Sequence, residues 1–393
     1  MGTEEMEAVI VAGVLRRAGA DVTLASVEDG LEVEASCGSR IVADTHIASC
    51  ADQVFDLVAL PGGMPGSVRL RDSDILQRIT VRQAEEKRLY GAICAAPAVV
   101  LTPWGLHRRK KVSGELTTSR GPGTAFQFAL SFVQQMFGPH TAEDMNRILM
   151  AQTHDDLERS AEVNEFEWSV DRNPEVLIPI ANGSEEMEII ILVDILRRAK
   201  INVVLASVEK SPTILGSQRI KIVADKSIMS ASDSIYDLII LPGGAAGAER
   251  LHRSRILKKL LKQQMQAGRM YGGVCSALKV LQQQGLLEDK TVTAHHAVRQ
   301  LCSFRGNFTV FSVPVFGLYF PRPQADTGIK GPELPRLFHS FVQVTQALCR
   351  KMYRHARKSQ AMVKLLRWKG GARVKLLRWT WIQLSGLLIK GTL

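Results

Sequence analysis

The chain has 393 residues, enough for two or three domains of ordinary size. Hydrophobic residues make up 46% and charged residues 23%, which is typical of a globular protein and excludes a mostly disordered chain. The net charge of +11 is unevenly spread. Residues 1–296 carry 33 Lys/Arg against 37 Asp/Glu (−4), and residues 297–393 carry 17 against 2 (+15). The basic character belongs to the last quarter of the chain and is no evidence for a nucleic-acid partner.

Cysteine spacing and hydropathy narrow the class further. The six cysteines at positions 37, 50, 94, 275, 302 and 349 form no CxxC pair, which argues against a disulfide scaffold or a metal cluster. No apolar stretch approaches the ~20 residues that span a bilayer. The first residues, MGTEEMEAV, lack the apolar core of a signal peptide. We therefore expect a soluble intracellular protein without a membrane span.

An internal repeat organises the first three quarters of the chain. GTEEME at 2–7 recurs as GSEEME at 183–188, and LPGG at 60–63 recurs at 241–244, both at an offset of 181 residues. Aligning 2–101 with 183–282 without a gap gives 43 identities in 100 positions. Chance does not produce such agreement, so one domain is duplicated in tandem. The period is too long for a solenoid, and each copy should have its own core.

The second copy shows the clearest pattern of secondary structure. Residues 171–174 form the linker, and the apolar run 176–180 reads as a buried parallel strand. A helix follows whose first turns carry Glu185, Glu186 and Glu188, a favourable charge pattern for a helix N-terminus. The remaining predicted elements are strands at 201–207, 236–241 and 270–274, and a helix at about 253–267. This alternation predicts two tandem α/β domains, each a parallel sheet between two layers of helices.

Both copies are incomplete by comparison with each other. Copy 1, at 1–170, has no counterpart of the strand 176–180. Copy 2, at 175–296, loses its similarity to copy 1 after about residue 296. An irregular basic tail fills 297–393 and contains VKLLRW twice, at 363–368 and 374–379. Two interpretations of the tail stay open, namely a basic arm for membrane surfaces or nucleic acid and an artefact of the gene model.

Each copy places a cysteine where a short apolar strand meets a helix. YGAIC ends at Cys94 and YGGVC ends at Cys275. Such a turn exposes a nucleophile at the carboxyl edge of the sheet, and the helix N-terminus behind it favours the thiolate. The Pro-Gly-Gly turn after the preceding strand offers backbone N–H groups that can approach an oxyanion closely. Recurrence of the whole arrangement in both copies favours function over a structural cysteine.

These motifs resemble those of a known family. GTEEMEAV, LPGGMPG, YGAICAAP and TSRGPGT at 118–124 closely resemble the DJ-1/PfpI family. The tandem arrangement is similar to the plant double-domain homologues and most like the chloroplast-type member. The resemblance covers about residues 1–296 and implies two tandem flavodoxin-like three-layer α/β/α domains, both incomplete.

The resemblance implies a low-pKa cysteine nucleophile assisted by an acid and a histidine, without a cofactor. The matching catalytic positions are Cys94 and Glu7 in copy 1, and Cys275, Glu188 and His295 in copy 2. The oxyanion and substrate-binding positions are Gly62, Gly63, Ala95 and Arg120 in copy 1, and Gly243, Gly244 and Ser276 in copy 2. Copy 1 has no matching histidine, and copy 2 has no SRGPGT segment.

Two functions from different classes follow from the resemblance. The first is cofactor-independent detoxification of methylglyoxal and glyoxal, as a glyoxalase or protein deglycase. The second is a non-enzymatic redox sensor or chaperone-like stress protein in which the elbow cysteine is oxidised. A peptidase or amidotransferase is a third reading, for which copy 1 lacks the Cys-His pair. The expected partner is a small dicarbonyl, with no nucleic acid, and the copies form an internal pseudo-dimer or the chain a homodimer. The resemblance implies the chloroplast, with the cytoplasm or nucleus as the alternative.

Overall fold

The computed structural model describes residues 1–107, 115–149, 173–287 and 317–319. Copy 1 comprises helices and short strands in this order: α1 (Glu5–Arg17), β1 (Ala25–Ser26), β2 (Glu32–Glu34), β3 (Arg40–Val42), β4 (Thr45–His46), a 3₁₀ turn (Ile47–Cys50), β5 (Leu57–Leu60), α2 (Gly66–Arg71), α3 (Asp74–Glu85), β6 (Leu89–Ile93), a π-helical turn (Pro97–Leu101), β7 (Leu116–Ser119), a 3₁₀ turn (Pro122–Thr124), α4 (Ala125–Phe137) and α5 (Pro139–Leu149).

Copy 2 repeats much of this order and adds a strand in front: β8 (Glu175–Ile180), α6 (Glu186–Arg198), β9 (Asn202–Ser207), β10 (Thr213–Leu215), β11 (Lys221–Val223), β12 (Lys226–Ser227), α7 (Ile228–Ala231), β13 (Leu238–Leu241), α8 (Ala245–Arg253), α9 (Arg255–Gln266), β14 (Met270–Gly273), α10 (Ala277–Gln283) and β15 (Gly317–Tyr319). The strands expected at 176–180, 201–207, 236–241 and 270–274 are confirmed as β8, β9, β13 and β14. The helix expected at about 253–267 is confirmed as α9, and the helix α8, which ends just before it at Arg253, is not among the predicted elements.

The sheet of copy 2 is a six-stranded sheet with the order β12-β9-β8-β13-β14-β15. All its pairs are parallel except β14–β15, which is antiparallel. The central strand β8 is buried on both faces from Val176 to Ile180: Ile178 packs with α6, and Leu177 packs with the helices of the other face. Burial on both faces explains why this strand reads as a continuous apolar run. The expected parallel sheet between helical layers is confirmed, with an antiparallel edge strand from the region assigned to the tail.

The corresponding sheet of copy 1 is divided. A two-stranded parallel sheet pairs β1 with β4, and a separate three-stranded parallel sheet has the order β5-β6-β7. At the 181-residue offset, β1 matches the end of β9 and β5 matches β13, the two strands that flank β8 in copy 2. Copy 1 is therefore split at the position where copy 2 has its central strand.

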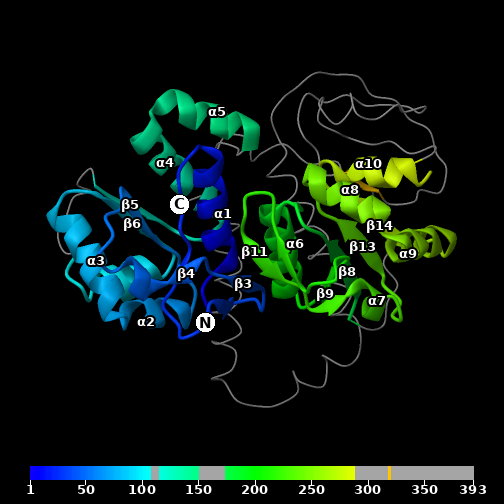
Figure 1. Ribbon diagram of the computed structural model, residues 1–393, viewed down its shortest axis with the longest axis horizontal. Coiled ribbons are helices and arrows are strands. Elements are labelled where there is room, and N and C mark those ends of the chain that lie inside the picture. The colour runs from blue at the N-terminus through cyan, green and yellow to red at the C-terminus, as the bar shows by residue number, and fades with distance from the viewer. Residues whose placement is uncertain (108–114, 150–172, 288–316, 320–393) are drawn as a thin grey trace, which may run out of the picture.

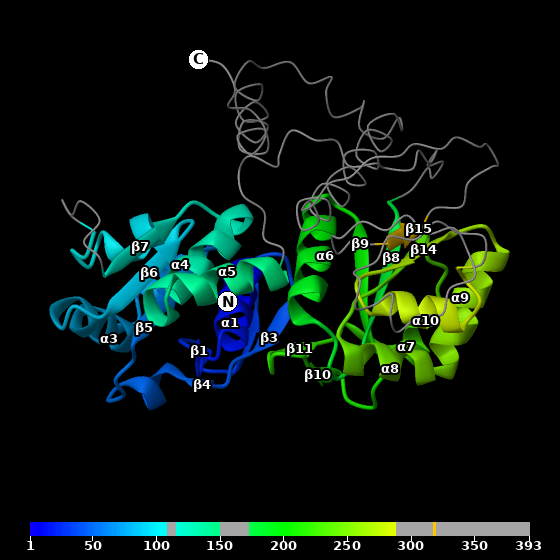
Figure 2. The ribbon, with the colours of Figure 1, turned by 90° about the horizontal axis from the view of Figure 1, so that it is seen from above.

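The two copies pack side by side through α1 and α6 (Figures 1 and 2). Below these helices β3 and β11 pair antiparallel, with Ile41 opposite its own counterpart Ile222, so a pseudo-twofold axis passes between them. Arg16 donates to the carbonyl of Gln218, and the equivalent Arg197 donates to the carbonyl of Cys37. This is an isologous contact of the kind found in symmetric dimers, formed within one chain.

One hydrophobic core runs through both copies. It includes Val9, Ile10 and Phe132 of copy 1 together with Ile190 and Leu196 of copy 2, all completely buried. Within the described residues, no helix has the length and apolar character that crossing a membrane requires.

Candidate functional site

Cys94 sits directly after β6 in a left-handed conformation, with φ +62°. Residues with a side chain rarely adopt this region, so the surrounding structure must hold it there. Its N–H donates to the carbonyl of Ser119 at 3.0 Å, which ties the elbow to the end of β7. The N–H groups of Gly63 and Ala95 point to the sulfur, and the residue is exposed on its outer side. The elbow thus presents a thiol beside two amide donors.

Glu7 reaches the same place from the first turns of α1. Its side chain is completely buried, and Oε2 accepts a hydrogen bond from Gly62 N at 2.7 Å. The carboxyl group also interacts with the Cys94 thiol. A Cβ added at Gly62 would lie 2.7 Å from the Cys94 Cβ, so only glycine allows the turn to come this close to the elbow. The sequence-predicted residues Glu7, Gly62, Gly63, Cys94 and Ala95 are therefore brought together.

The electrostatics of this pair differ from the sequence expectation. Burial raises the pKa of Glu7 to about 7, against the opposing hydrogen bonds from Gly62 and Cys94. The protein around the sulfur desolvates it and, together with the Glu7 charge, raises the pKa of Cys94. The low thiol pKa implied by the resemblance is not found. A carboxyl group with a pKa near 7 can instead hold or release a proton near neutrality, which suits general acid–base chemistry.

Copy 2 repeats the arrangement with a more enclosed thiol. Glu188 of α6 accepts from Gly243 N at 2.6 Å, and Cys275 again has a positive φ, +49°. Burial, followed by the charge of Glu188, raises the pKa of Cys275 to about 12. Burial likewise raises the pKa of Glu188 to about 8. Ser276 donates its N–H toward this sulfur, as Ala95 does in copy 1.

The other predicted residues fall outside this cluster. Gly244 has φ +89° and ends the Pro-Gly-Gly turn of copy 2, as Gly63 with φ +88° ends the equivalent turn of copy 1. Arg120 is exposed one residue beyond β7, next to the carbonyl that holds Cys94. His295 lies outside the described residues. The role of Ser119 was missed, although its place in the SRGPGT segment beside the elbow is a usable signal.

A second cluster lies at the contact between the copies. Potential ligand atoms of Glu5, Cys37 and Asp194 lie within 4.8 Å of one another. The Glu5 carboxylate already accepts from Ser36 and from the Cys37 N–H, and Asp194 is paired with Arg198. Burial and the nearby acids raise the pKa of Cys37 to about 12, so its thiol stays protonated, whereas metals bind the thiolate. The cluster is a hydrogen-bonded part of the interface.

Fold and site together define an α/β protein with an elbow cysteine and a buried glutamate in each of two tandem copies. The chain belongs to the DJ-1/PfpI family, whose model matches residues 1–115 and 174–308. Protein DJ-1 homolog A of Arabidopsis thaliana is 41% identical over 323 residues, covering 76% of this chain and 82% of the relative. Protein DJ-1 homolog B of the same plant is 39% identical and covers 76% and 74%.

A shorter relative has an activity in its name. The glutathione-independent glyoxalase DJR-1.2 of Caenorhabditis elegans is 31% identical over 164 residues, which cover 36% of this chain and 87% of that protein. One copy of the present chain therefore corresponds in size to that whole relative.

Proposed function

We propose that copy 1 converts methylglyoxal and glyoxal to hydroxy acids without a cofactor, through Cys94 and Glu7. The observation that carries the proposal is the contact of an exposed elbow thiol with a buried carboxyl group whose pKa is about 7. The amides of Gly63 and Ala95 supply two donors for an oxyanion next to the sulfur. The glyoxalase named among the relatives supports the same reaction class.

The reaction follows from these groups. Glu7, in its ionised form, removes the thiol proton, and the sulfur adds to the aldehyde carbon of methylglyoxal. The carbonyl electron pair moves to oxygen, which takes the proton back to give a hemithioacetal. Transfer of a proton from the sulfur-bearing carbon to its neighbour, through an enediol, gives the lactate thioester. Water then cleaves the C–S bond, releasing lactate and the free thiol, so that the net reaction is addition of one water molecule.

Both elbow cysteines are exposed residues, and copy 1 is the stronger candidate because burial raises the pKa of its thiol less than that of Cys275. The Cys275 thiol has a pKa of about 12, and ionising it near neutrality is correspondingly costly. A peptidase-type mechanism has less support, since it needs a histidine that acts on the thiol, and no described histidine is among the groups that shift the pKa of Cys94.

The test is lactate formation by the full chain with methylglyoxal. We expect Cys94→Ala to abolish it and Cys275→Ala to retain most of it. The variant Cys37→Ala, which removes a thiol at the contact between the copies, is the control. If Cys94→Ala forms lactate at the parent rate, the assignment is wrong.

A redox sensor is the second candidate, favoured by the exposure of Cys94 and by its two amide donors. In that case hydrogen peroxide would oxidise the thiolate to a sulfenate and a second equivalent would give the sulfinate, with one water released at each step. Mild peroxide followed by intact-mass and peptide analysis should then add two oxygen atoms selectively at Cys94. Lactate formation with no selective oxidation would favour the enzyme, and selective oxidation without turnover would favour the sensor.

A further inference from the structure

One arginine of copy 2 reaches across the contact between the copies to the helix that carries Glu7. Arg198 of α6 donates to Glu4 Oε1 at 2.7 Å, although the two residues are 194 positions apart in the chain. Glu4 is the buried N-cap residue of α1, and its other carboxyl oxygen, Oε2, accepts from the Glu7 N–H at 2.7 Å. A single carboxyl group thus joins the guanidinium of one copy to the backbone of Glu7 in the other.

Glu4 also holds the glycine turn that bonds the Glu7 side chain. The Glu4 N–H donates to Gly62 O at 3.0 Å, and the Gly62 N–H donates to Glu7 Oε2 at 2.7 Å. The same carboxyl group of Glu7 interacts with the Cys94 thiol. A continuous path of hydrogen bonds therefore leads from Arg198 through Glu4 to the Glu7 carboxyl group and the elbow.

Copy 2 has the pseudo-symmetric arginine but a different path. Arg17 of α1 pairs with Glu185, the counterpart of Glu4. The Glu185 carboxyl group accepts from the Met187 N–H at 3.4 Å, one residue short of Glu188, and from Ser217 Oγ at 2.6 Å. Among the described residues, the carboxyl group that binds the arginine therefore reaches the amide of the site glutamate only in copy 1.

The charges around Glu7 come from both copies. Burial is the main cause that raises the pKa of Glu7 to about 7; of the charged side chains of α6, Arg198 lowers this pKa and its ion-pair partner Asp194 raises it. The titratable groups of copy 1 that interact with Glu7 are Glu4 and Cys94. Helix α4, which packs on α1, carries no titratable side chain. The charged pair of α6 is therefore the contribution of copy 2 to the surroundings of Glu7.

We propose that Arg198 is a positioning residue of the copy 1 site, which acts through Glu4 to hold the Glu7 carboxyl group beside the Cys94 thiol. This inference rests on the proposed function of Glu7 as the base that removes the thiol proton. The hydrogen bonds of Arg198 go to Glu4 and Asp194, so its effect on the reaction is indirect. Proton transfer from the thiol to Glu7 then depends on the contact between the copies, because the positive charge that stabilises the ionised carboxylate belongs to copy 2.

The test uses the full chain with Cys275→Ala, so that lactate formation reports on Cys94 alone. Into this parent are placed Arg198→Met, Arg198→Lys and Asp194→Asn, with Arg17→Met as the matched control at the pseudo-symmetric position. The value of kcat/KM for methylglyoxal is measured between about pH 5 and pH 9, where the ionisation of a general base appears as an acid limb.

A second measurement does not depend on turnover. The titration of the Glu7 carboxyl group is followed by nuclear magnetic resonance on protein that contains carbon-13-labelled glutamate, and the Glu7 signal is identified by its loss in Glu7→Gln. The midpoint of either curve does not depend on the fraction of folded protein, so a loss of stability in Arg198→Met does not obscure the result.

Arg198→Met should move the acid limb and the Glu7 titration to higher pH by about half a pH unit or more, because the ionised carboxylate loses a nearby positive charge. Asp194→Asn should move both curves to lower pH, because it removes a negative charge. Arg198→Lys keeps the charge and should stay closer to the parent than Arg198→Met does. Arg17→Met should leave both curves in place.

A merely structural role of Arg198 would reduce the amount of active protein without moving either curve. Unmoved midpoints in Arg198→Met, or shifts in the same direction for Arg198→Met and Asp194→Asn, would therefore overturn the proposal. A parent chain that forms no lactate would refute the proposed function alone, since the resonance titration of Glu7 still measures the effect of Arg198.

Discussion

Arg198 provides the sharpest test of how the two copies are held together. Its guanidinium donates to Asp194 at 2.5 and 3.1 Å and to Glu4 of the other copy at 2.7 Å. Asp194 is 1% exposed and Glu4 is 3% exposed. Among the described residues, Arg198 is the only cation that forms an ion pair with either acid. Replacing it by methionine would keep most of the apolar stem but remove the positive charge.

The size of the effect depends on the protonation of Glu4. Burial, with the nearby charges of Asp194 and Glu7, raises the pKa of Glu4 to about 9, so Glu4 is mostly neutral at pH 7. The variant would therefore leave one buried charge unpaired, that of Asp194. Breaking a buried pair costs about 3–5 kcal/mol, and the partial exposure of Arg198 reduces this, so we expect Arg198→Met to lower the free energy of unfolding by about 2–3 kcal/mol.

The chain offers a matched control at the pseudo-symmetric position. Arg17 pairs with Glu185, but Gly13 stands where Asp194 stands in copy 2, so this side has one carboxylate fewer. Urea unfolding at pH 7 should show a smaller loss for Arg17→Met, because the buried Glu185 keeps its hydrogen bonds from Ser217 Oγ and from the Met187 N–H after the arginine is removed. Adding Asp194→Ala to Arg198→Met should recover part of the lost stability, because it removes the orphaned charge. Equal losses for the two arginine variants, or no recovery in the double variant, would refute the reasoning.

Three further changes test the site and the core. Gly62→Ala would place a Cβ 2.9 Å from Ile93 O as well as against Cys94. It should lower the free energy of unfolding in urea by about 1–3 kcal/mol and remove most of the reactivity of the Cys94 thiol toward iodoacetamide. Normal reactivity would contradict the close approach of this turn to the elbow. Leu177→Ala in β8 removes a fully buried side chain and should cost about 2–5 kcal/mol, whereas Ile148→Ala at a 63% exposed position should change the unfolding free energy by less than about 0.5 kcal/mol. Between pH 4.5 and about 7 the folded protein keeps a proton on Glu7 that the unfolded chain releases. The free energy of unfolding should therefore fall with rising pH by on the order of 3 kcal/mol from this group. Glu7→Gln should flatten this part of the plot of stability against pH, and an unchanged slope would contradict the raised pKa of Glu7.

The sequence predicts the fold well where the repeat is strong. The strands around Cys275 and the position of β8 follow from apolar runs, and the elbow geometry follows from the small residues that flank each cysteine. The start of α9 is readable from the sequence, because Ser254 is an N-cap whose side chain accepts from Leu257 N at 3.3 Å, whereas the preceding helix α8 is not predicted. The antiparallel strand β15 depends on pairing across more than forty residues of chain, which no local pattern encodes.

The thiol pKa shows a different limit of sequence reasoning. A helix N-terminus beside Cys94 is visible in the motif and by itself favours the thiolate. The opposing effects are burial and the charge of Glu7, a residue 87 positions earlier in the chain. Their balance is set by packing density and distance in the folded protein, and here it lies on the side of the neutral thiol.

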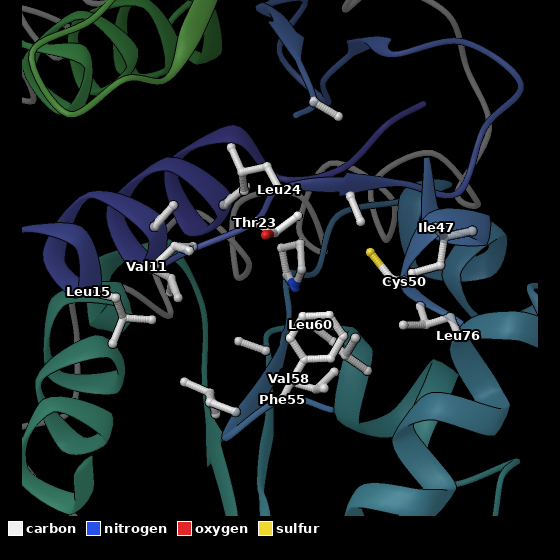
Figure 3. Close-up of a pocket in the computed structure, with 18 of the residues that line it drawn as sticks. Val11, Leu15, Thr23, Leu24, Ile47, Cys50, Phe55, Val58, Leu60 and Leu76 are labelled. Carbon is white, nitrogen blue, oxygen red and sulfur yellow. The ribbon is translucent and has the colours of Figure 1, made fainter. Parts of the chain in front are cut away.

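The contact between the copies also explains how Glu7 keeps its position beside an incomplete sheet. One side of α1 lines a cavity of about 1040 Å³, through Val11 and Leu15 (Figure 3). Its other sides belong to the shared core, where Ile10 and Val14 are packed in one continuous cluster with α4 and with α6 of copy 2. A Cβ at Gly13 would lie 3.1 Å from the Met187 sulfur, so α1 and α6 approach closely at this point. Since α1 is fixed from the side of copy 2, the Glu7 carboxylate can stay bonded to Gly62 N without a central strand beneath the helix. The second copy therefore acts as the scaffold of the first site, whatever chemistry its own cysteine performs.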